Sequence, residues 1–127
     1  MSAAPARHGA AERFVAVFER TWGSEDPERY APLWHPEGVR LHPLMEDPLP
    51  REKVARHLRA GLAAGGDRSP RVERWVAAGD TVMIEWTAAG VIAGQLVELR
   101  GAERFTLSGD RAVAWERLFR HAAVPED

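Results

Sequence analysis

Two charged side chains occupy strand positions where the hydrophobic pattern otherwise places apolar residues. In residues 97–105 every second residue is apolar or glycine except Glu103, and the bulky alternate side chains of residues 113–119 include Arg117. Successive side chains of a β-strand point to opposite faces, so both charges are expected on the inner face of a sheet. A lone buried charge costs several kcal/mol, which leaves two interpretations. Either the two residues form a structural salt bridge, or they line a cavity and contact a ligand or water.

These two interpretations differ in what the loss of one partner costs. Breaking a bridge that is only structural leaves an uncompensated buried charge and lowers stability by about 3–5 kcal/mol. In a wet pocket, water solvates the surviving charge and the loss is nearer ~1 kcal/mol. We predict the second outcome, in which Glu103→Gln keeps most of the stability but loses turnover or ligand binding.

The composition excludes several other kinds of chemistry. The chain has 127 residues, of which 45% are hydrophobic and 28% charged, as is typical of one globular domain. Its 17 basic and 19 acidic residues give a net charge of −2, which argues against a nucleic-acid partner. It has no cysteine, its histidines match no metal-ligand spacing, and it has no glycine-rich phosphate loop. We therefore expect neither a metal nor a cofactor.

The sequence also lacks the signals of export and of membrane insertion. Its N-terminal residues contain no apolar run that could serve as a signal peptide. No stretch approaches the roughly 20 apolar residues that a membrane span requires. We therefore expect a cytoplasmic protein without a membrane partner.

The periodicity of the apolar residues divides the chain into a helical first half and a strand-rich second half, an order typical of an α+β fold. Three- and four-residue spacing predicts helices over residues 10–22 and 51–62. Between them a short helix is predicted to start at Asp26 and Pro27 and to stop before Pro36. Period-two alternation predicts four long strands, over residues 71–77, 81–89, 95–107 and 112–120, after a short strand over residues 39–42.

Alternation also assigns the two faces of each long strand. The inner face of the second long strand is predicted to carry Val82, Ile84, Trp86 and Ala88. In the third strand the inner set is Val97, Leu99, Gly101, Glu103 and Phe105, and in the fourth it is Val113, Trp115, Arg117 and Phe119. The outward residues Glu98, Arg100, Arg104 and Glu116 are charged.

Four segments resemble the SnoaL-like branch of the nuclear transport factor 2 superfamily. They are YAPLWHPEGV (residues 30–39), GDTVMIEWT (79–87), LRGAERF (99–105) and GDRAVAW (109–115). The resemblance covers residues 11–119 and implies a single domain over residues 1–127 with flexible tails. It implies a cone in which three helices pack on a strongly curved, mainly antiparallel sheet and enclose an apolar pocket. It also implies a homodimer that pairs through the convex face of the sheet.

The same resemblance suggests roles for the polar residues. His42 falls where ketosteroid isomerase carries its general base, and a neutral imidazole can move a proton. Glu103 falls where that isomerase holds a protonated acid as an oxyanion donor. Phe14 replaces the second donor, a tyrosine, which argues against steroid isomerisation by the standard apparatus. Residues 88–95 lack the histidine-rich segment of true polyketide cyclases, and no inward Asp is available for the epoxide hydrolase pattern.

Two functions are compatible with these residues. The first is a cofactor-independent enzyme that isomerises, cyclises or dehydrates a small lipophilic carbonyl compound, with His42, Glu103 and Arg117 as its catalytic residues. The second is a non-catalytic module that binds a lipophilic ligand, or a dimerising scaffold filled by its own tryptophans. A cavity of a few hundred Å³ where the three residues converge would favour catalysis, and a packed interior the scaffold. The predicted pocket is lined by Phe14, Phe18, Tyr30, Trp34, His57, Leu58, Ile84, Trp86, Leu99, Phe105, Trp115 and Phe119.

Overall fold

The computed structural model describes residues 4–24, 26–42, 44–63 and 68–122. The helical elements come first: α1 (Ala4–Thr21), the 3-10 helix η1 (Pro27–Leu33) and α2 (Arg51–Ala63). The strands follow as β1 (Arg68–Ala78), β2 (Thr81–Ile92), β3 (Gln95–Ser108) and β4 (Arg111–Ala122). They form one antiparallel sheet in the order β1-β2-β3-β4. The predicted α+β fold is confirmed.

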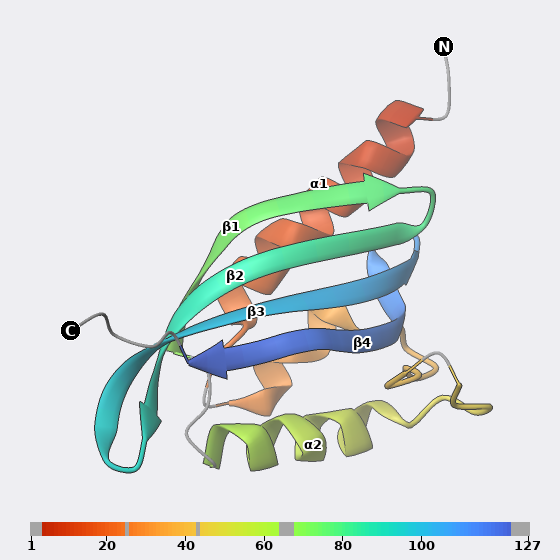
Figure 1. Cartoon of the computed structure of the whole chain (residues 1–127). Coiled ribbons are helices and arrows are strands. Elements are labelled where there is room, and N and C mark those ends of the chain that lie inside the picture. The colour runs from red at the N-terminus through yellow and green to blue at the C-terminus, as the bar shows by residue number, and fades with distance from the viewer. Residues whose placement is uncertain (1–3, 25, 43, 64–67, 123–127) are drawn as a thin grey trace.

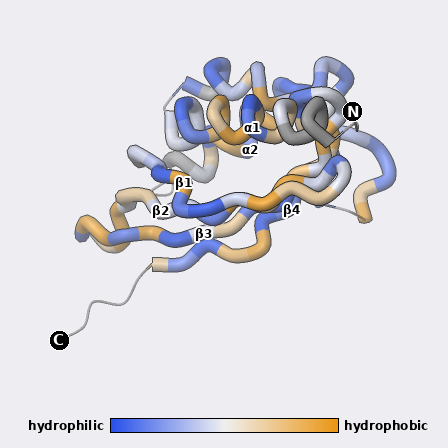
Figure 2. The backbone as a smooth tube through the Cα atoms, turned by 90° about the horizontal axis from the view of Figure 1, so that it is seen from above, coloured by the Kyte–Doolittle hydropathy of each residue, from blue (hydrophilic) through white to orange (hydrophobic). Residues whose placement is uncertain are grey.

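The molecule has two layers, with the helices on one face of a curled, open sheet (Figures 1 and 2). Short turns join successive strands, and the turn between β2 and β3 consists of Ala93 and Gly94, both with positive φ. α1 starts at Ala4 and β4 ends at Ala122, so regular structure extends beyond the predicted core of residues 11–119. The other residues of the predicted flexible tails lie outside the described part of the chain. No helix in that part is long and apolar enough to cross a membrane.

Two of the predicted elements differ in kind from the expectation. The helix that follows Asp26 is a 3-10 helix, and Pro32 lies inside it. Proline has no N–H to donate and so disfavours a longer α-helix there. Its predicted start is confirmed, because the Asp26 side chain accepts a hydrogen bond from the Glu28 N–H at 3.0 Å. The predicted strand over residues 39–42 is reduced to isolated bridges, in which Arg40 pairs with Ala114 and Val39 with Leu49.

The face assignment of β2 and β3 is confirmed. The inner residues of β2 are buried, with Ile84 at 0% and Trp86 at 1% exposed, whereas Met83 on the other face is 40% exposed. On β3, Leu99, Glu103 and Phe105 are fully buried. Side chains from α1, η1 and α2 form one hydrophobic core with those of this inner face.

The face assignment of β4 is wrong at Phe119. Glu103 pairs with Arg117, but the preceding Ala102 pairs with Phe119, so β4 contains an extra residue, Leu118, at a bulge. One inserted residue reverses the alternation beyond it. Phe119 therefore lies opposite Ala102 on the outer face, 43% exposed, and does not line the interior. A second bulge at Val113 likewise places Ala112, rather than Val113, opposite the buried Leu107.

Candidate functional site

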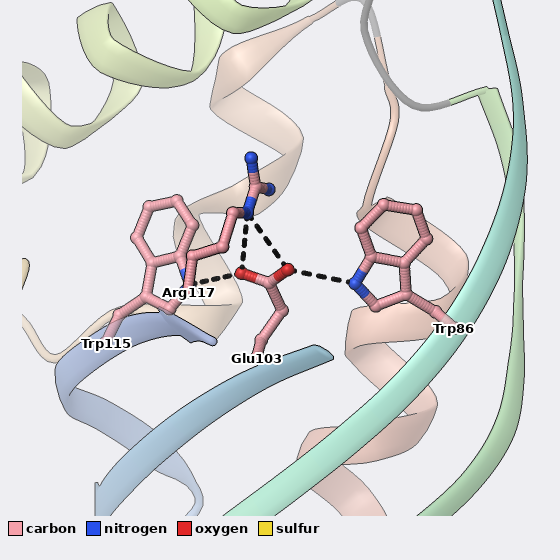
Figure 3. A network of polar contacts seen from close by, with 4 residues as sticks. All are labelled: Trp86, Glu103, Trp115 and Arg117. Carbon is pink, nitrogen blue, oxygen red and sulfur yellow. Dashed lines mark hydrogen bonds and ion pairs between the residues drawn. The ribbon is translucent and has the colours of Figure 1, made fainter. Parts of the chain in front are cut away.

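The candidate site is centred on the carboxylate of Glu103, which is fully buried on the inner face of β3. The Trp86 indole N–H donates to Oε2 at 3.0 Å, and the Trp115 indole N–H donates to Oε1 at 2.8 Å. The Arg117 Nε–H lies 3.2 Å from Oε1 and 3.1 Å from Oε2 (Figure 3). Each carboxylate oxygen therefore accepts one hydrogen bond from a neutral indole and one from the Arg117 cation.

The register of the strands brings these four side chains together. Arg117 on β4 lies directly opposite Glu103, and Trp115 lies opposite Phe105, one step further along the same face. On the other side, Trp86 on β2 lies opposite Gly101 and reaches Glu103 diagonally. Cross-strand and diagonal neighbours on one face are within reach of long and aromatic side chains. The two bulges of β4, at Val113 and Leu118, lie on either side of this stretch, so Trp115 and Arg117 share the inward face.

Gly101 provides the space that the Trp86 ring occupies. A β-carbon at this position would lie 2.2 Å from a carbon of the Trp86 six-membered ring. Any larger residue would therefore displace the indole, whose N–H donates to Glu103. A glycine inside a strand often marks such a close approach, and that signal in the sequence could have identified Gly101 as a site residue.

The electrostatics of Glu103 are dominated by its burial. Loss of solvent raises the pKa of its carboxyl group above the usual value of 4.5, because a low-dielectric interior disfavours the charged form. The charge of Arg117 and the hydrogen bonds from Trp115, Trp86 and Arg117 oppose this rise in pKa. The sequence left open whether the pair is a structural bridge or faces a ligand. The bridge is formed, and Arg117 still has 37% of its side chain exposed.

Aromatic rings surround this polar group. Trp115 stacks on Trp34 at a centroid distance of 5.7 Å and on Phe105 at 6.2 Å. The Arg117 guanidinium carbon lies 5.8 Å from the centre of the Trp115 ring, within the range of a cation–π interaction. Trp22, which the predicted pocket left out, makes edge contacts with both Trp34 and Trp115. The sequence could have indicated Trp22, because it belongs to the apolar stripe of the first predicted helix.

The structure does not bring His42 to this site. Its side chain is exposed, and it follows Arg40, the residue that pairs with β4. Val39, which alternation places on the face opposite to His42, is fully buried. Another histidine, His57 on α2, is exposed but presents its ring to Trp115 at a centroid distance of 5.8 Å and an interplanar angle of 80°.

Most of the predicted pocket residues belong to the buried hydrophobic core. The buried ones are Phe14, Phe18, Tyr30, Trp34, Leu58, Ile84, Trp86, Leu99, Phe105 and Trp115. Neither Glu103 nor Arg117 lines the hollow between η1 and α2 or the hollow beside Phe119 on the sheet. That the buried residues line a ligand pocket stays a prediction. Among the described residues no cluster of His, Asp and Glu has the geometry of a metal site.

Comparisons with known proteins agree on the fold. A family model described as the SnoaL-like domain matches residues 11–115. A putative polyketide cyclase from Acidithiobacillus ferrooxidans is 19% identical with a TM-score of 0.71, covering 87% of each chain. A Catenulispora acidiphila protein with a ketosteroid isomerase-like fold, in complex with trimethylamine, is 17% identical with a TM-score of 0.68, covering 84% of each. An epoxide hydrolase from M. tuberculosis is 21% identical with a TM-score of 0.63, covering 86% of this chain and 81% of that one. No curated protein matches the sequence.

Proposed function

Because the chain belongs to the SnoaL-like domain family, we propose that it binds a small lipophilic molecule that carries a carbonyl or carboxylate oxygen. The Arg117 guanidinium contacts that oxygen, and the aromatic rings around Trp115 contact the apolar part of the ligand. Several similar structures bear names that denote small-molecule chemistry or a bound small molecule, which is consistent with this class of ligand.

One observation supports the proposal: the buried carboxylate of Glu103 fixes the Arg117 guanidinium at Nε, while 37% of the Arg117 side chain is exposed. Nε donates to the buried Glu103, and Figure 3 shows the two Nη atoms pointing away from that carboxylate. A cation fixed in advance by a buried partner loses little conformational entropy when it binds an oxygen. Such preorganisation supports recognition of an anionic or carbonyl group.

The same contacts make Glu103 a positioning residue in this proposal. Both of its oxygens already accept hydrogen bonds from indole N–H groups and from Nε. An acceptor occupied in this way is poorly suited to donate a proton to a substrate oxygen, which was the role suggested by the likeness to ketosteroid isomerase. Glu103 instead fixes the orientation of Arg117.

Catalysis on the same ligand is the second candidate function. A fixed Arg117 could stabilise an enolate during isomerisation, cyclisation or dehydration. The imidazole that the resemblance suggested as the base, His42, is exposed away from the core. The contact of His57 with Trp115 favours His57 as the base, because Arg117 lies against the same indole. Replacement of His57 by Gln would then abolish turnover and leave ligand affinity within about twofold.

The experiment that tests binding compares three ligands that share one carbon skeleton: a fatty carboxylate, the methyl ketone and the alkane. Native mass spectrometry and tryptophan fluorescence measure binding to the wild type, to Arg117→Gln and to the control Arg100→Gln. Arg100 is a suitable control because it is an exposed arginine of β3 that lies opposite Thr87 of β2 on the outer face of the sheet. We expect the carboxylate and the ketone to bind and Arg117→Gln to weaken both about tenfold or more, as for a lost charge-assisted hydrogen bond. Equal affinities for all three ligands, or equal losses in both variants, would refute the role of Arg117.

We also propose that two copies pair through the outer face of the sheet. Val76, Met83 and Phe119 are 60%, 40% and 43% exposed there. Cross-strand ion pairs, Arg74 with Glu85 and Arg104 with Glu116, accompany them. Apolar side chains among polar ones are typical of a protein–protein interface.

A further inference from the structure

A second arginine lies beside Arg117 on the inner face of β4. Arg117 is opposite Glu103 of β3, and Arg120 is opposite Gly101. Glu103 and Gly101 are two positions apart on β3 and therefore share a face, so their partners on β4 share it as well. The extra residue of the Leu118 bulge makes this possible, because two residues three positions apart on a regular strand face opposite sides. Arg117 and Arg120 are therefore neighbours, about 7 Å apart along the strand.

The residues that flank Arg120 agree with this direction. Ala122 lies opposite the fully buried Leu99 and packs against the hydrophobic core. Phe119 and His121 alternate with these inner residues, are both exposed, and stack on each other at a centroid distance of 5.3 Å. Alternation therefore places Arg120 on the inner face together with Ala122. The side chain of Arg120 is also exposed, so its cation is accessible to a ligand.

An aromatic ring lies on the same rung of the sheet as Arg120. Gly101 pairs with Arg120 on one side and with Trp86 of β2 on the other. The Trp86 ring lies over Gly101, since a β-carbon there would be 2.2 Å from a ring carbon. The position of Arg120 is therefore separated from this ring only by a residue without a side chain. Apolar and cationic groups thus adjoin on this face, which suits a ligand with a polar head and an apolar chain.

The charges on this part of the inner face do not balance. Four successive rungs cross β2, β3 and β4, and their residues are Ala88, Leu99 and Ala122, then Trp86, Gly101 and Arg120, then Ile84, Glu103 and Arg117, then Val82, Phe105 and Trp115. These rungs contain two arginines and one glutamate, and that glutamate already pairs with Arg117. Their net charge is therefore positive. Electrostatic complementarity favours a ligand that brings a negative charge to this surface over a neutral one.

We propose that Arg120 is a specificity-determining residue, which contacts one oxygen of a ligand carboxylate while Arg117 contacts the other. This inference rests on the proposed function and narrows its ligand to a lipophilic carboxylate. A neutral carbonyl group offers one oxygen, which Arg117 can satisfy alone. A carboxylate offers two oxygens and a full negative charge, so each guanidinium group can form a charge-assisted hydrogen bond with it. The second arginine therefore adds affinity for a carboxylate and little for a ketone.

Tryptophan fluorescence titrations of the intact protein test this preference. The probes are decanoate and its methyl ketone, which share one carbon chain. We expect the wild type to bind decanoate at least about tenfold more tightly than the ketone. Arg120→Gln should weaken decanoate binding about tenfold and leave ketone binding within about twofold, because the ketone contacts only Arg117. Arg120→Lys keeps the charge and should keep most of the preference for decanoate.

Arg100→Gln is the matched control. Arg100 is an exposed arginine on the outer face, where it pairs with His121 of β4, and its loss should change neither affinity. The proposal is overturned if Arg120→Gln keeps the preference of the wild type or weakens both ligands equally. It is also overturned if Arg120→Lys loses as much decanoate affinity as Arg120→Gln, because the charge would then not be the cause.

Failure of the proposed function gives a different result. In that case the wild type binds decanoate, the ketone and the matching alkane equally or not at all, or Arg117→Gln loses no more affinity than Arg100→Gln. The role of Arg120 then fails with it. Ketone binding that depends on Arg117, combined with a decanoate preference that does not depend on Arg120, overturns the role of Arg120 alone.

Discussion

Replacing Glu103 by glutamine tests whether the buried carboxylate holds its neighbours through charge or through the number of acceptors it offers. The raised pKa means that folding does not favour the ionised form of Glu103, because burial opposes the charge more than Arg117 and the indoles support it. The charge of the pair therefore contributes little net stability. What glutamine removes is one acceptor oxygen, since its amide nitrogen cannot accept a hydrogen bond.

The size of the effect follows from the donors that remain. Oε1 is held by Trp115 and Oε2 by Trp86, so the amide nitrogen must face one of the two indole N–H groups. A buried donor left without an acceptor costs about 1–3 kcal/mol. We therefore expect Glu103→Gln to lower the free energy of unfolding by about 1–3 kcal/mol, above the ~1 kcal/mol predicted for a wet pocket.

A double-mutant cycle measured by urea denaturation separates this cause from others. In Trp86→Phe the indole N–H is gone, so the amide nitrogen of Glu103→Gln can face the vacated side without conflict. We expect the cost of Glu103→Gln to fall by at least half in that background. Glu85→Gln is the control, because its ion pair with Arg74 is exposed on the outer face and should change stability by less than about 1 kcal/mol. An equal cost of Glu103→Gln in both backgrounds would refute the reasoning.

The remaining predictions concern packing, pH and assembly. Gly101→Ala should lose about 1–3 kcal/mol in urea denaturation because its methyl group collides with Trp86, whereas Gly61→Ala, with open space around it, should be neutral or slightly stabilising. A pKa raised in the folded state means that the stability contributed by Glu103 is complete below pH 4.5 and is lost as the pH rises through the raised pKa. The difference in unfolding free energy between wild type and Glu103→Gln should therefore shrink over that window, and a difference that grows would contradict the direction of the shift. Sedimentation should give a dimer at micromolar concentration that Phe119→Glu converts to a monomer, and a wild-type monomer would remove the proposed interface.

The sequence predicted the site where simple alternation holds and failed where the backbone departs from it. Glu103 interrupts an apolar face on an uninterrupted strand, so its burial could be inferred from parity alone. On β4 the extra residue at Leu118 reversed the parity of Phe119, and no single-residue signal marks such a bulge. His42 was assigned by its likeness to a position in ketosteroid isomerase. The pairing with β4 stops at Arg40, and His42 beyond it is exposed.

Contacts between distant elements were also out of reach. That Trp86 and Trp115 both donate to one carboxylate depends on the registers of two strand pairs, which local patterns do not specify. The contact of His57 with Trp115 depends on how α2 packs over β4. The sequence thus indicated which residue types matter, and the tertiary structure decided which of them meet.

The arrangement around Glu103 explains why its position and its chemistry suggest different roles. A carboxyl group that is to donate a proton in catalysis needs one oxygen directed at the substrate. Here both oxygens are directed at donors from neighbouring strands, and the carboxylate is fully buried. The cation on its far side is the group that still reaches solvent, with 37% of its side chain exposed. Our proposal therefore assigns the ligand contact to Arg117, because a ligand could reach an oxygen of Glu103 only by releasing Trp86 or Trp115 from its hydrogen bond.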